Sequence, residues 1–206
     1  MINPHIGIAG NIGAGKTTLT EKLTSKFDWE PIYESVVDNP YLEDFYEDMS
    51  KWSFNLQIYF LNHRFQNQVT LSTMNKGFVQ DRTIYEDKEI FAKNLRDLNF
   101  LSDRDWKTYE NLFDNMTDFI REPDLIIYLK ASTDTLLSRI QGRNRDFEKN
   151  IDPEYIHSLN IYYDKWIASL DQRKTLIVKT DNFNIFKDKE RLDQIFKLIK
   201  SRIDSL

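Results

Sequence analysis

Short apolar segments alternate along the chain with long stretches in which apolar residues recur every three or four positions. The apolar segments predict strands at about residues 5–9, 30–34, 78–81, 125–129 and 175–178. The stretches between them predict helices over residues 17–27, 40–48, 52–73, 85–98, 103–121, 133–141, 153–170 and 188–203. This alternation is typical of a parallel sheet with helices on both faces.

Composition and charge narrow the class of protein. The 206 residues are 40% hydrophobic and 14% aromatic, which is enough for one compact domain over residues 1–206. The formal net charge of −5, without a long basic run, does not suggest a nucleic-acid-binding surface. The chain has no cysteine, no signal-peptide pattern and no apolar stretch of membrane length. We therefore expect a cytoplasmic protein that binds neither nucleic acid nor a membrane.

Residues 10–17 carry the complete pattern G-x-x-x-x-G-K-[ST] between a predicted strand and a predicted helix. In such a phosphate loop, successive backbone N–H groups point toward one anion, and the lysine brings a positive charge to the β- and γ-phosphates. The final hydroxyl binds Mg²⁺. The pattern therefore predicts nucleotide binding by Gly10, Asn11, Ile12, Gly13, Ala14, Gly15, Lys16 and Thr17.

Three charged residues follow predicted strands, and ligands bind at the carboxyl ends of the strands in sheets of this kind. Glu34 ends the second predicted strand and is a candidate general base, the alternative being a solvated glutamate. Asp81 ends the third and is a candidate ligand for Mg²⁺ opposite Thr17, with Arg82 facing phosphate. The alternative for this adjacent pair is a simple surface ion pair.

Two sets of polar residues lie on predicted helices. Gln57 and Arg64 are seven residues apart and therefore share one helix face, where a glutamine amide can pair with a nucleobase or can simply be solvated. Arg139, Arg143 and Arg145 surround the end of the helix predicted over residues 133–141. They suggest a mobile lid that neutralises a transferring phosphate, the alternative being a solvated basic turn.

Taken together, these segments resemble the deoxyribonucleoside kinase family over nearly the whole chain. Residues 10–18, which include Thr18, look like its phosphate loop, and Glu34 lies where the family has its base, with Ser35 replacing the usual proline. Residues 46–57 resemble the nucleoside-site helix, in which Tyr46 meets the sugar 3′-hydroxyl and Gln57 reads the base. Arg64 falls on the family's arginine near the base.

The resemblance continues toward the carboxyl end of the chain. Residues 81–87 resemble the Glu/Asp-Arg-Ser motif, in which Asp87 senses base substituents together with the arginine near the base. Residues 139–145 resemble the lid, although the common Arg-Gly-Arg order is replaced by Gly142-Arg143-Asn144-Arg145. Glu148 matches the glutamate that contacts the sugar, and residues 181–184 match the loop that recognises the nucleobase of the phosphate donor.

The resemblance implies an α/β P-loop kinase fold with a five-stranded parallel sheet flanked by helices and a short arginine-rich lid. The implied reaction is Mg²⁺-dependent transfer of the γ-phosphoryl group of ATP to the 5′-hydroxyl of a deoxynucleoside, in nucleotide salvage. We expect deoxyadenosine first, then deoxyguanosine or deoxycytidine. The resemblance also implies a homodimer and feedback inhibition by a deoxynucleoside triphosphate.

The implied roles divide the site between the two substrates. Glu34 accepts the proton of the 5′-hydroxyl, and Arg82 positions that hydroxyl and the phosphate. Charge on the phosphates is stabilised by Lys16, Arg139 and Arg143, and ATP is also contacted by Arg145.

Other classes of nucleotide-binding protein share parts of the pattern. A nucleoside monophosphate kinase of the thymidylate type has a similar loop, Asp-Arg pair and lid, but Tyr46, Trp52 and Gln57 argue against it. A non-catalytic sensor that binds ATP would need no base, and the chain retains Glu34. A GTPase is disfavoured because the Asn-Lys-x-Asp and Asp-x-x-Gly elements are missing.

Overall fold

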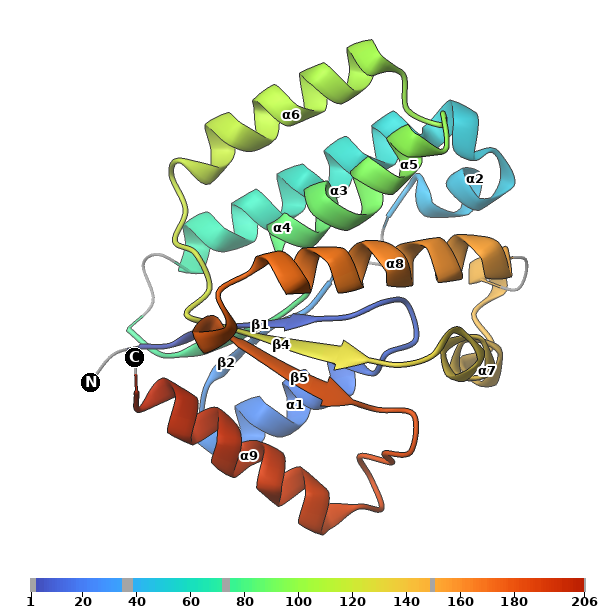
Figure 1. Cartoon of the computed structure of the whole chain (residues 1–206). Helices are drawn as coiled ribbons and strands as arrows, with labels where there is room; N and C mark the ends of the chain where they lie inside the picture. Colours follow the sequence, from blue (N-terminus) through green and yellow to red (C-terminus); the bar gives the residue numbers. More distant parts are fainter. Residues whose placement is uncertain (1–2, 35–38, 72–74, 149–150, 206) are drawn as a thin grey trace.

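Five parallel strands form one sheet in the computed structural model, which describes residues 3–34, 39–71, 75–148 and 151–205. Within these residues the order of the strands is β2-β3-β1-β4-β5 (Figure 1). The strands are β1 (His5–Ala9), β2 (Glu30–Ile32), β3 (Phe78–Asp81), β4 (Leu125–Lys130) and β5 (Thr175–Lys179). The prediction of a five-stranded parallel sheet is confirmed.

Helices cover both faces of the sheet (Figure 1). One face carries α1 and α9, and the other carries α8 with the layer of α3, α4 and α5, outside which α6 lies. The helices are α1 (Lys16–Phe27), α2 (Leu42–Glu47), α3 (Met49–Leu71), α4 (Ile84–Glu86), α5 (Lys93–Asp97), α6 (Asp103–Thr117), α7 (Thr133–Arg143), α8 (Pro153–Ser169) and α9 (Lys189–Ile203). None of these helices is both long enough and apolar enough to cross a membrane.

The register of the central strands brings distant residues to one edge of the sheet. Ile8 on β1 pairs with Asp81 on β3. The loop after β1 therefore starts beside the last residue of β3. Ile6, Ile8, Val79 and Ile127 are fully buried in the core on these strands. Burial on both faces explains why the strands appear in the sequence as nearly continuous apolar segments.

Several boundaries differ from the predicted ones. β2 ends at Ile32, so Glu34 lies beyond the strand rather than in its last position. The single helix predicted over residues 85–98 is divided into α4, a π-helical segment (Asp87–Ala92) and α5. A π-helical hydrogen bond spans one more residue than an α-helical one, and a periodic apolar pattern does not reveal one local insertion. α6 ends at Thr117, six residues before Pro123, instead of at residue 121.

Candidate active site

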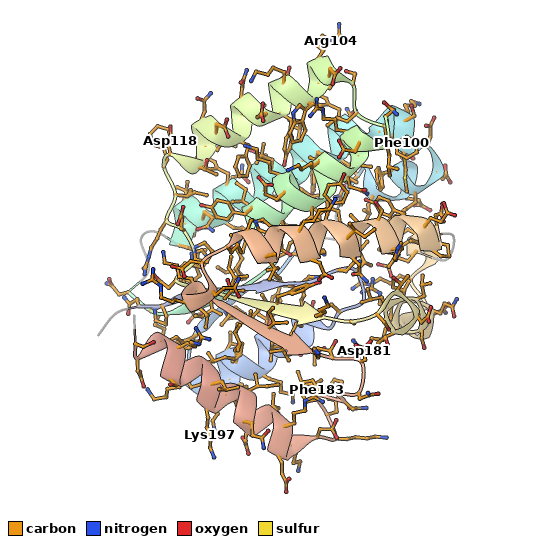
Figure 2. The ribbon with its side chains drawn as sticks, in the orientation of Figure 1. Phe100, Arg104, Asp118, Asp181, Phe183 and Lys197 are labelled. Atoms are coloured by element: carbon orange, nitrogen blue, oxygen red, sulfur yellow. The ribbon has the colours of Figure 1, made fainter. Side chains whose placement is uncertain are left out.

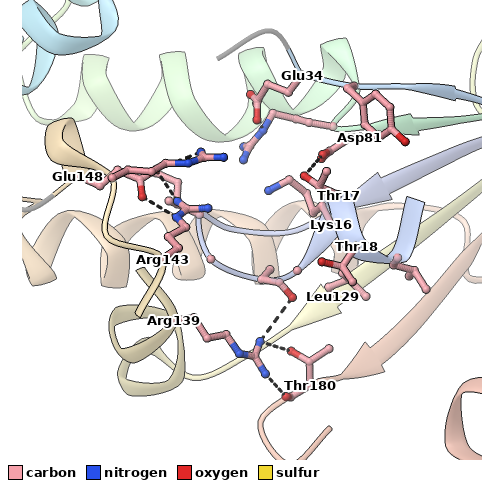
Figure 3. Close-up of a pocket in the computed structure, with 18 of the residues that line it drawn as sticks. Lys16, Thr17, Thr18, Glu34, Asp81, Leu129, Arg139, Arg143, Glu148 and Thr180 are labelled. Carbon is pink, nitrogen blue, oxygen red and sulfur yellow. Dashed lines mark hydrogen bonds and ion pairs between the residues drawn. The ribbon is translucent and has the colours of Figure 1, made fainter. Parts of the chain in front are cut away.

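A cavity of about 870 Å³ opens at the carboxyl ends of the strands, a size typical of small-molecule sites. The phosphate loop, the segment after β2, helices α2 and α3, the lid region and the segment after β5 all contribute to its walls (Figure 3). Of the predicted site residues, only Gly10, Asn11 and Arg64 do not line it. The structure therefore brings together predicted site residues as far apart in the sequence as Ile12 and Glu148.

The phosphate loop has the backbone conformation that its glycines allow. Gly13 and Gly15 have φ of 83° and 96°, in the left-handed region that side chains rarely adopt. At Gly13 a Cβ atom would also lie 3.0 Å from the carbonyl oxygen of Leu136. The loop leads directly into α1, and the residues from Gly15 to Leu19 line the cavity, so the amino end of a helix, which favours bound phosphate, lies at the site.

Lys16 is almost completely buried at the start of α1, and its Nζ donates to the carbonyl oxygen of Asn11 at 3.2 Å. Burial, reinforced by the nearby charge of Arg82, lowers the pKa of Lys16 to about 8. The carboxylates of Asp81 and Glu34 oppose this shift without cancelling it. A lysine that loses part of its hydration in this way gains most from an incoming phosphate.

Thr17 and Asp81 present oxygen atoms that fit Mg²⁺. Thr17 Oγ1 donates to Asp81 Oδ2 at 2.5 Å, and Asp81 Oδ1 is buried without a hydrogen-bond partner among the described residues (Figure 3). Magnesium prefers hard oxygen ligands, usually one or two from protein with the others from phosphate and water. Elsewhere in the described part of the chain, no group of three or more acidic, histidine or cysteine residues is placed to hold a metal ion.

Glu34 is held between two buried arginines. Its Oε1 lies 2.7 Å from Arg64 Nη2 and 3.1 Å from Arg82 Nε. Burial alone would raise the pKa of Glu34, but the charges of Arg82, Arg64 and Lys16 outweigh burial and hold the pKa at about 2. The carboxylate is therefore ionised and points a hydrogen-bond acceptor toward the cavity at neutral pH.

Arg64 connects this carboxylate to a second one. Its Nε lies 2.5 Å from Asp87 Oδ2, and its side chain is only 5% exposed. Burial raises the pKa of Asp87, and Arg64 opposes that rise. Arg64 thus stabilises two buried negative charges. It lies behind Glu34 and Asp87, which line the cavity, and does not line the cavity itself.

The other end of the cavity suits a flat ring. Gln57 is 2% exposed, and its Oε1 is buried without a hydrogen-bond partner among the described residues. Tyr46 stacks on Phe147, with ring centroids 6.3 Å apart and an interplanar angle of 10°. The wall is completed by side chains that sequence reasoning did not select, among them Phe45, Phe60, Phe91, Phe147 and Tyr155. Their apolar periodicity predicts core packing and gives no signal that separates a pocket wall from a core.

The predicted lid arginines separate into two groups (Figure 3). Arg143 makes a two-point ion pair with Glu148, with Nε to Oε2 at 2.6 Å and Nη2 to Oε1 at 2.5 Å, and Arg145 Nη1 lies 3.6 Å from the same carboxylate. Arg139 instead donates to the carbonyl oxygen of Thr180 after β5 at 2.5 Å. Only Arg143 and Arg145 therefore converge on one carboxylate.

The segment after β5 lines another wall of the cavity, with residues between Thr180 and Asp188. Asp181 and Phe183 lie in this segment (Figure 2). Asp181 Oδ1 accepts from the backbone N–H of Ser132 at 2.7 Å and from Thr135 Oγ1 at 2.9 Å. The hydrogen bond from the Ser132 backbone is the main reason that the pKa of Asp181 is lowered to about 2. The segment is thereby fixed to the start of α7.

A phosphate loop at the carboxyl end of the central strand β1, beside a cavity lined by charged residues, defines a phosphotransferase with the P-loop kinase fold. The sequence of residues 6–204 matches the model of the deoxynucleoside kinase family. The chain is 46% identical to the deoxyadenosine kinase of Dictyostelium discoideum, over 94% of this chain and 78% of that protein. It is 39% identical to the deoxyadenosine/deoxycytidine kinase of Bacillus subtilis (strain 168), over 98% and 94%. The chain belongs to the deoxynucleoside kinase family.

Solved structures agree with this assignment. The deoxyadenosine kinase from M. mycoides with the products dCMP and dCDP bound superposes with a TM-score of 0.84 at 32% identity, covering 96% of this chain and 99% of that one. The same enzyme with bound dATP gives a TM-score of 0.83 at 31% identity, with the same coverage. The predicted family, fold and deoxynucleoside kinase activity are confirmed, whereas the roles of individual residues stay predictions.

Proposed function

We propose that this kinase transfers the γ-phosphoryl group of ATP to the 5′-hydroxyl of deoxyadenosine, with deoxyguanosine and deoxycytidine as weaker acceptors, in nucleotide salvage. The observation that supports it best is one cavity shared by a phosphate loop and a buried aromatic end that contains an unpaired amide oxygen. The free Oε1 of Gln57 requires an N–H donor, which the amino groups of adenine and cytosine supply. The deoxyadenosine kinases among the relatives favour adenine.

In this proposal the chain's own residues hold the 5′-hydroxyl of the acceptor in line with the γ-phosphorus of ATP and the oxygen that leaves with ADP. The 5′-hydroxyl attacks the γ-phosphorus, its proton passes to a carboxylate oxygen of Glu34, and the bond to the β-phosphate breaks to release ADP. A carboxylate whose pKa is near 2 is a weak base, which suits a loose transition state in which the attacking hydroxyl loses its proton late. Arg82 and Lys16 balance the charge on the transferring group.

Mg²⁺ is part of the proposal, with Thr17 and Asp81 as the residues that would hold it. When bound, the ion would supply positive charge that neutralises the phosphates of ATP. A homodimer, a cytoplasmic location and one domain over the whole chain stay predictions. Feedback inhibition also stays a proposal, supported by the dATP found in the solved relative.

The lid supplies the remaining charge in this proposal. Arg143 and Arg145 would turn from Glu148 toward the phosphates of ATP, and the released Glu148 would accept a hydrogen bond from the sugar. Arg139, which donates to Thr180, would hold in place the segment after β5 that contacts ATP in this proposal.

The experiment that tests the function is ADP release, dependent on ATP and Mg²⁺, against the four deoxynucleosides, adenosine, cytidine and thymidine monophosphate. We expect the highest kcat/KM with deoxyadenosine. Phosphorylation of thymidine monophosphate alone would instead support the thymidylate-type reaction and overturn the roles of Tyr46 and Gln57. Binding of ATP without turnover of any acceptor would support the sensor.

The pKa of Lys16 predicts how the reaction depends on pH. Since kcat/KM reports ionisations of the free enzyme, kcat/KM for ATP should fall above pH of about 8, approaching tenfold per pH unit, because the neutral amine no longer attracts phosphate. The measurement is kcat/KM for ATP between about pH 6.5 and 9.5. In Lys16→Arg, whose guanidinium stays charged throughout, we expect a lower but flat profile. An identical fall in both proteins would assign the ionisation to another group.

A further inference from the structure

Glu86 is a fully buried carboxylate that lies behind the phosphate loop, and no role was predicted for it from the sequence. Its Oε2 accepts from the backbone N–H of Thr83 at 2.8 Å, which is one half of a capping box at the start of α4. Its Oε1 accepts from the backbone N–H of Gly10 at 3.2 Å. Capping explains the first bond, whereas the second ties α4 to the first residue of the phosphate loop.

Tyr163 on α8 extends this contact toward Arg82. The fully buried hydroxyl lies 2.8 Å from Glu86 Oε1 and 2.9 Å from the carbonyl oxygen of Gly10, and it accepts from Arg82 Nη1 at 2.9 Å. The hydroxyl has one hydrogen, so it donates to one of the two oxygens at a time while its lone pairs stay available to Arg82. Burial raises the pKa of Tyr163 well above its ordinary value, so the hydroxyl keeps that hydrogen.

Arg82 needs such support because its backbone is strained. Its φ of 68° is in the left-handed region, which is unfavourable for a residue with a side chain. The chain holds it from several directions: its N–H donates to Ile8, its carbonyl accepts from Arg64, and its guanidinium lies over the ring of Phe91 at 4.3 Å. The bond to Tyr163 orients the guanidinium itself, with Nε left to face Glu34.

We propose that Glu86 and Tyr163 are positioning residues for the phosphoryl transfer. They fix the guanidinium of Arg82 relative to both Glu34 and the phosphate loop, so that the acceptor side and the donor side of the reaction share one rigid frame. Glu86 sets the direction of the Tyr163 hydroxyl, and that hydroxyl sets the direction of Arg82. This inference rests on the role proposed above for Arg82.

Tyr163→Phe tests the inference directly, since it removes one oxygen and keeps the ring. That ring is stacked on Tyr128, with centroids 5.6 Å apart, and meets the edge of Phe91. Loss of a hydrogen bond to a charged group predicts a fall in kcat between about tenfold and a hundredfold, with KM for ATP and deoxyadenosine within about twofold of the parent. The matched control is Tyr128→Phe in the same stacked pair, whose hydroxyl bonds to Asp164 away from the site and should leave kcat unchanged.

A double-mutant cycle separates positioning from general packing. In an Arg82→Met background, which retains an unbranched chain but no donor, Tyr163→Phe should change the residual single-turnover rate by less than about twofold. If Tyr163→Phe lowers the rate equally in both backgrounds, the hydroxyl does not act through Arg82 and the inference is wrong. If Arg82→Met alone has no effect, the role proposed for Arg82 fails as well.

Glu86→Gln provides a second variant with a different signature. A glutamine has one amide NH₂, and in either orientation this group would face a backbone N–H, of Gly10 or of Thr83. We therefore expect both a lower kcat and a higher KM for ATP, because the phosphate loop is displaced together with Arg82. Denaturant midpoints measured for all variants show whether each is folded under the assay conditions. A folded Glu86→Gln protein with the parent's kcat and KM would overturn the part assigned to Glu86.

Discussion

Replacing Glu34 with glutamine is expected to lower kcat by about 10²- to 10³-fold while changing KM for ATP by less than about threefold. The substitution keeps the size of the side chain and removes the oxygen that would accept the proton of the 5′-hydroxyl. ATP would still meet the same phosphate loop, because among the described residues Glu34 accepts from Arg64 and pairs with Arg82 and accepts no hydrogen bond from that loop. Steady-state kinetics with deoxyadenosine at several ATP concentrations measure both constants.

The effect should exceed what a weak base alone would contribute. Glu34 also forms ion pairs with Arg64 and Arg82. Without its negative charge, these guanidinium groups are free to turn toward Asp87 or the cavity. Under the roles proposed above, the substitution removes the proton acceptor and also loosens the guanidinium groups of Arg64 and Arg82.

Glu30→Gln is the matched control for this experiment. Glu30 lies on β2 four residues earlier, and its partner Lys76 is 3.4 Å away on the surface. Because exposed ion pairs contribute little, the control should retain the parent's kcat. A Glu34→Gln enzyme that turns over as fast as the control would remove Glu34 from the reaction.

Arg64→Leu is expected to lower the free energy of unfolding by about 3–5 kcal/mol, since it leaves two buried carboxylates without their shared partner. Both of its ion pairs are short, at 2.7 Å to Glu34 and 2.5 Å to Asp87, and water reaches little of either pair. Glu34 keeps Arg82 as a second partner, so most of the cost should fall on Asp87. Urea unfolding at neutral pH measures the change.

The destabilisation should depend on pH in a defined direction. Burial already raises the pKa of Asp87 above its value in the unfolded chain, and removal of Arg64 raises it further. A raised carboxyl pKa means that the folded protein binds more protons, so Arg64→Leu should be less damaging near pH 5 than near pH 8. In the double variant Arg64→Leu/Asp87→Leu, part of the stability should return.

Arg96→Leu serves as the control on the surface. Arg96 pairs with Asp103 at 3.3 Å, and 42% of its side chain is exposed. We expect this variant to lose less than about 1 kcal/mol. If Arg64→Leu and Arg96→Leu were equally stable, the buried triad would not contribute in the way its geometry suggests.

Prediction from the sequence succeeded where the chemistry is local. The phosphate loop needs particular residues within eight positions, so its pattern in the sequence defines both its conformation and its place between β1 and α1. The parallel sheet follows from apolar segments that must be buried on both faces. The position of Asp81 at the end of β3 was predicted for the same reason.

Prediction failed where contacts cross the chain. Glu86 and Tyr163 are 77 positions apart, and each looks like an ordinary helical residue until α4 and α8 are placed side by side. The hydrogen bond of Arg139 to Thr180 was missed for the same reason, because Thr180 lies 41 residues away in the sequence, directly after β5. Glu34 reached the site although β2 ends early, since its partners Arg64 and Arg82, rather than the strand, hold its side chain.

The hydrogen bonds that join α7 to the segment after β5 have a mechanical consequence. Asp181 accepts hydrogen bonds from Ser132 and Thr135 at the start of α7, and Arg139 in the middle of α7 donates to Thr180, so α7 is joined at two points to the segment after β5. These bonds couple the position of α7 to that of this wall of the cavity. If residues 139–145 close over ATP as proposed, the segment after β5 should move together with α7, and a substitution on either partner should alter both how long ATP stays bound and how fast its phosphate is transferred.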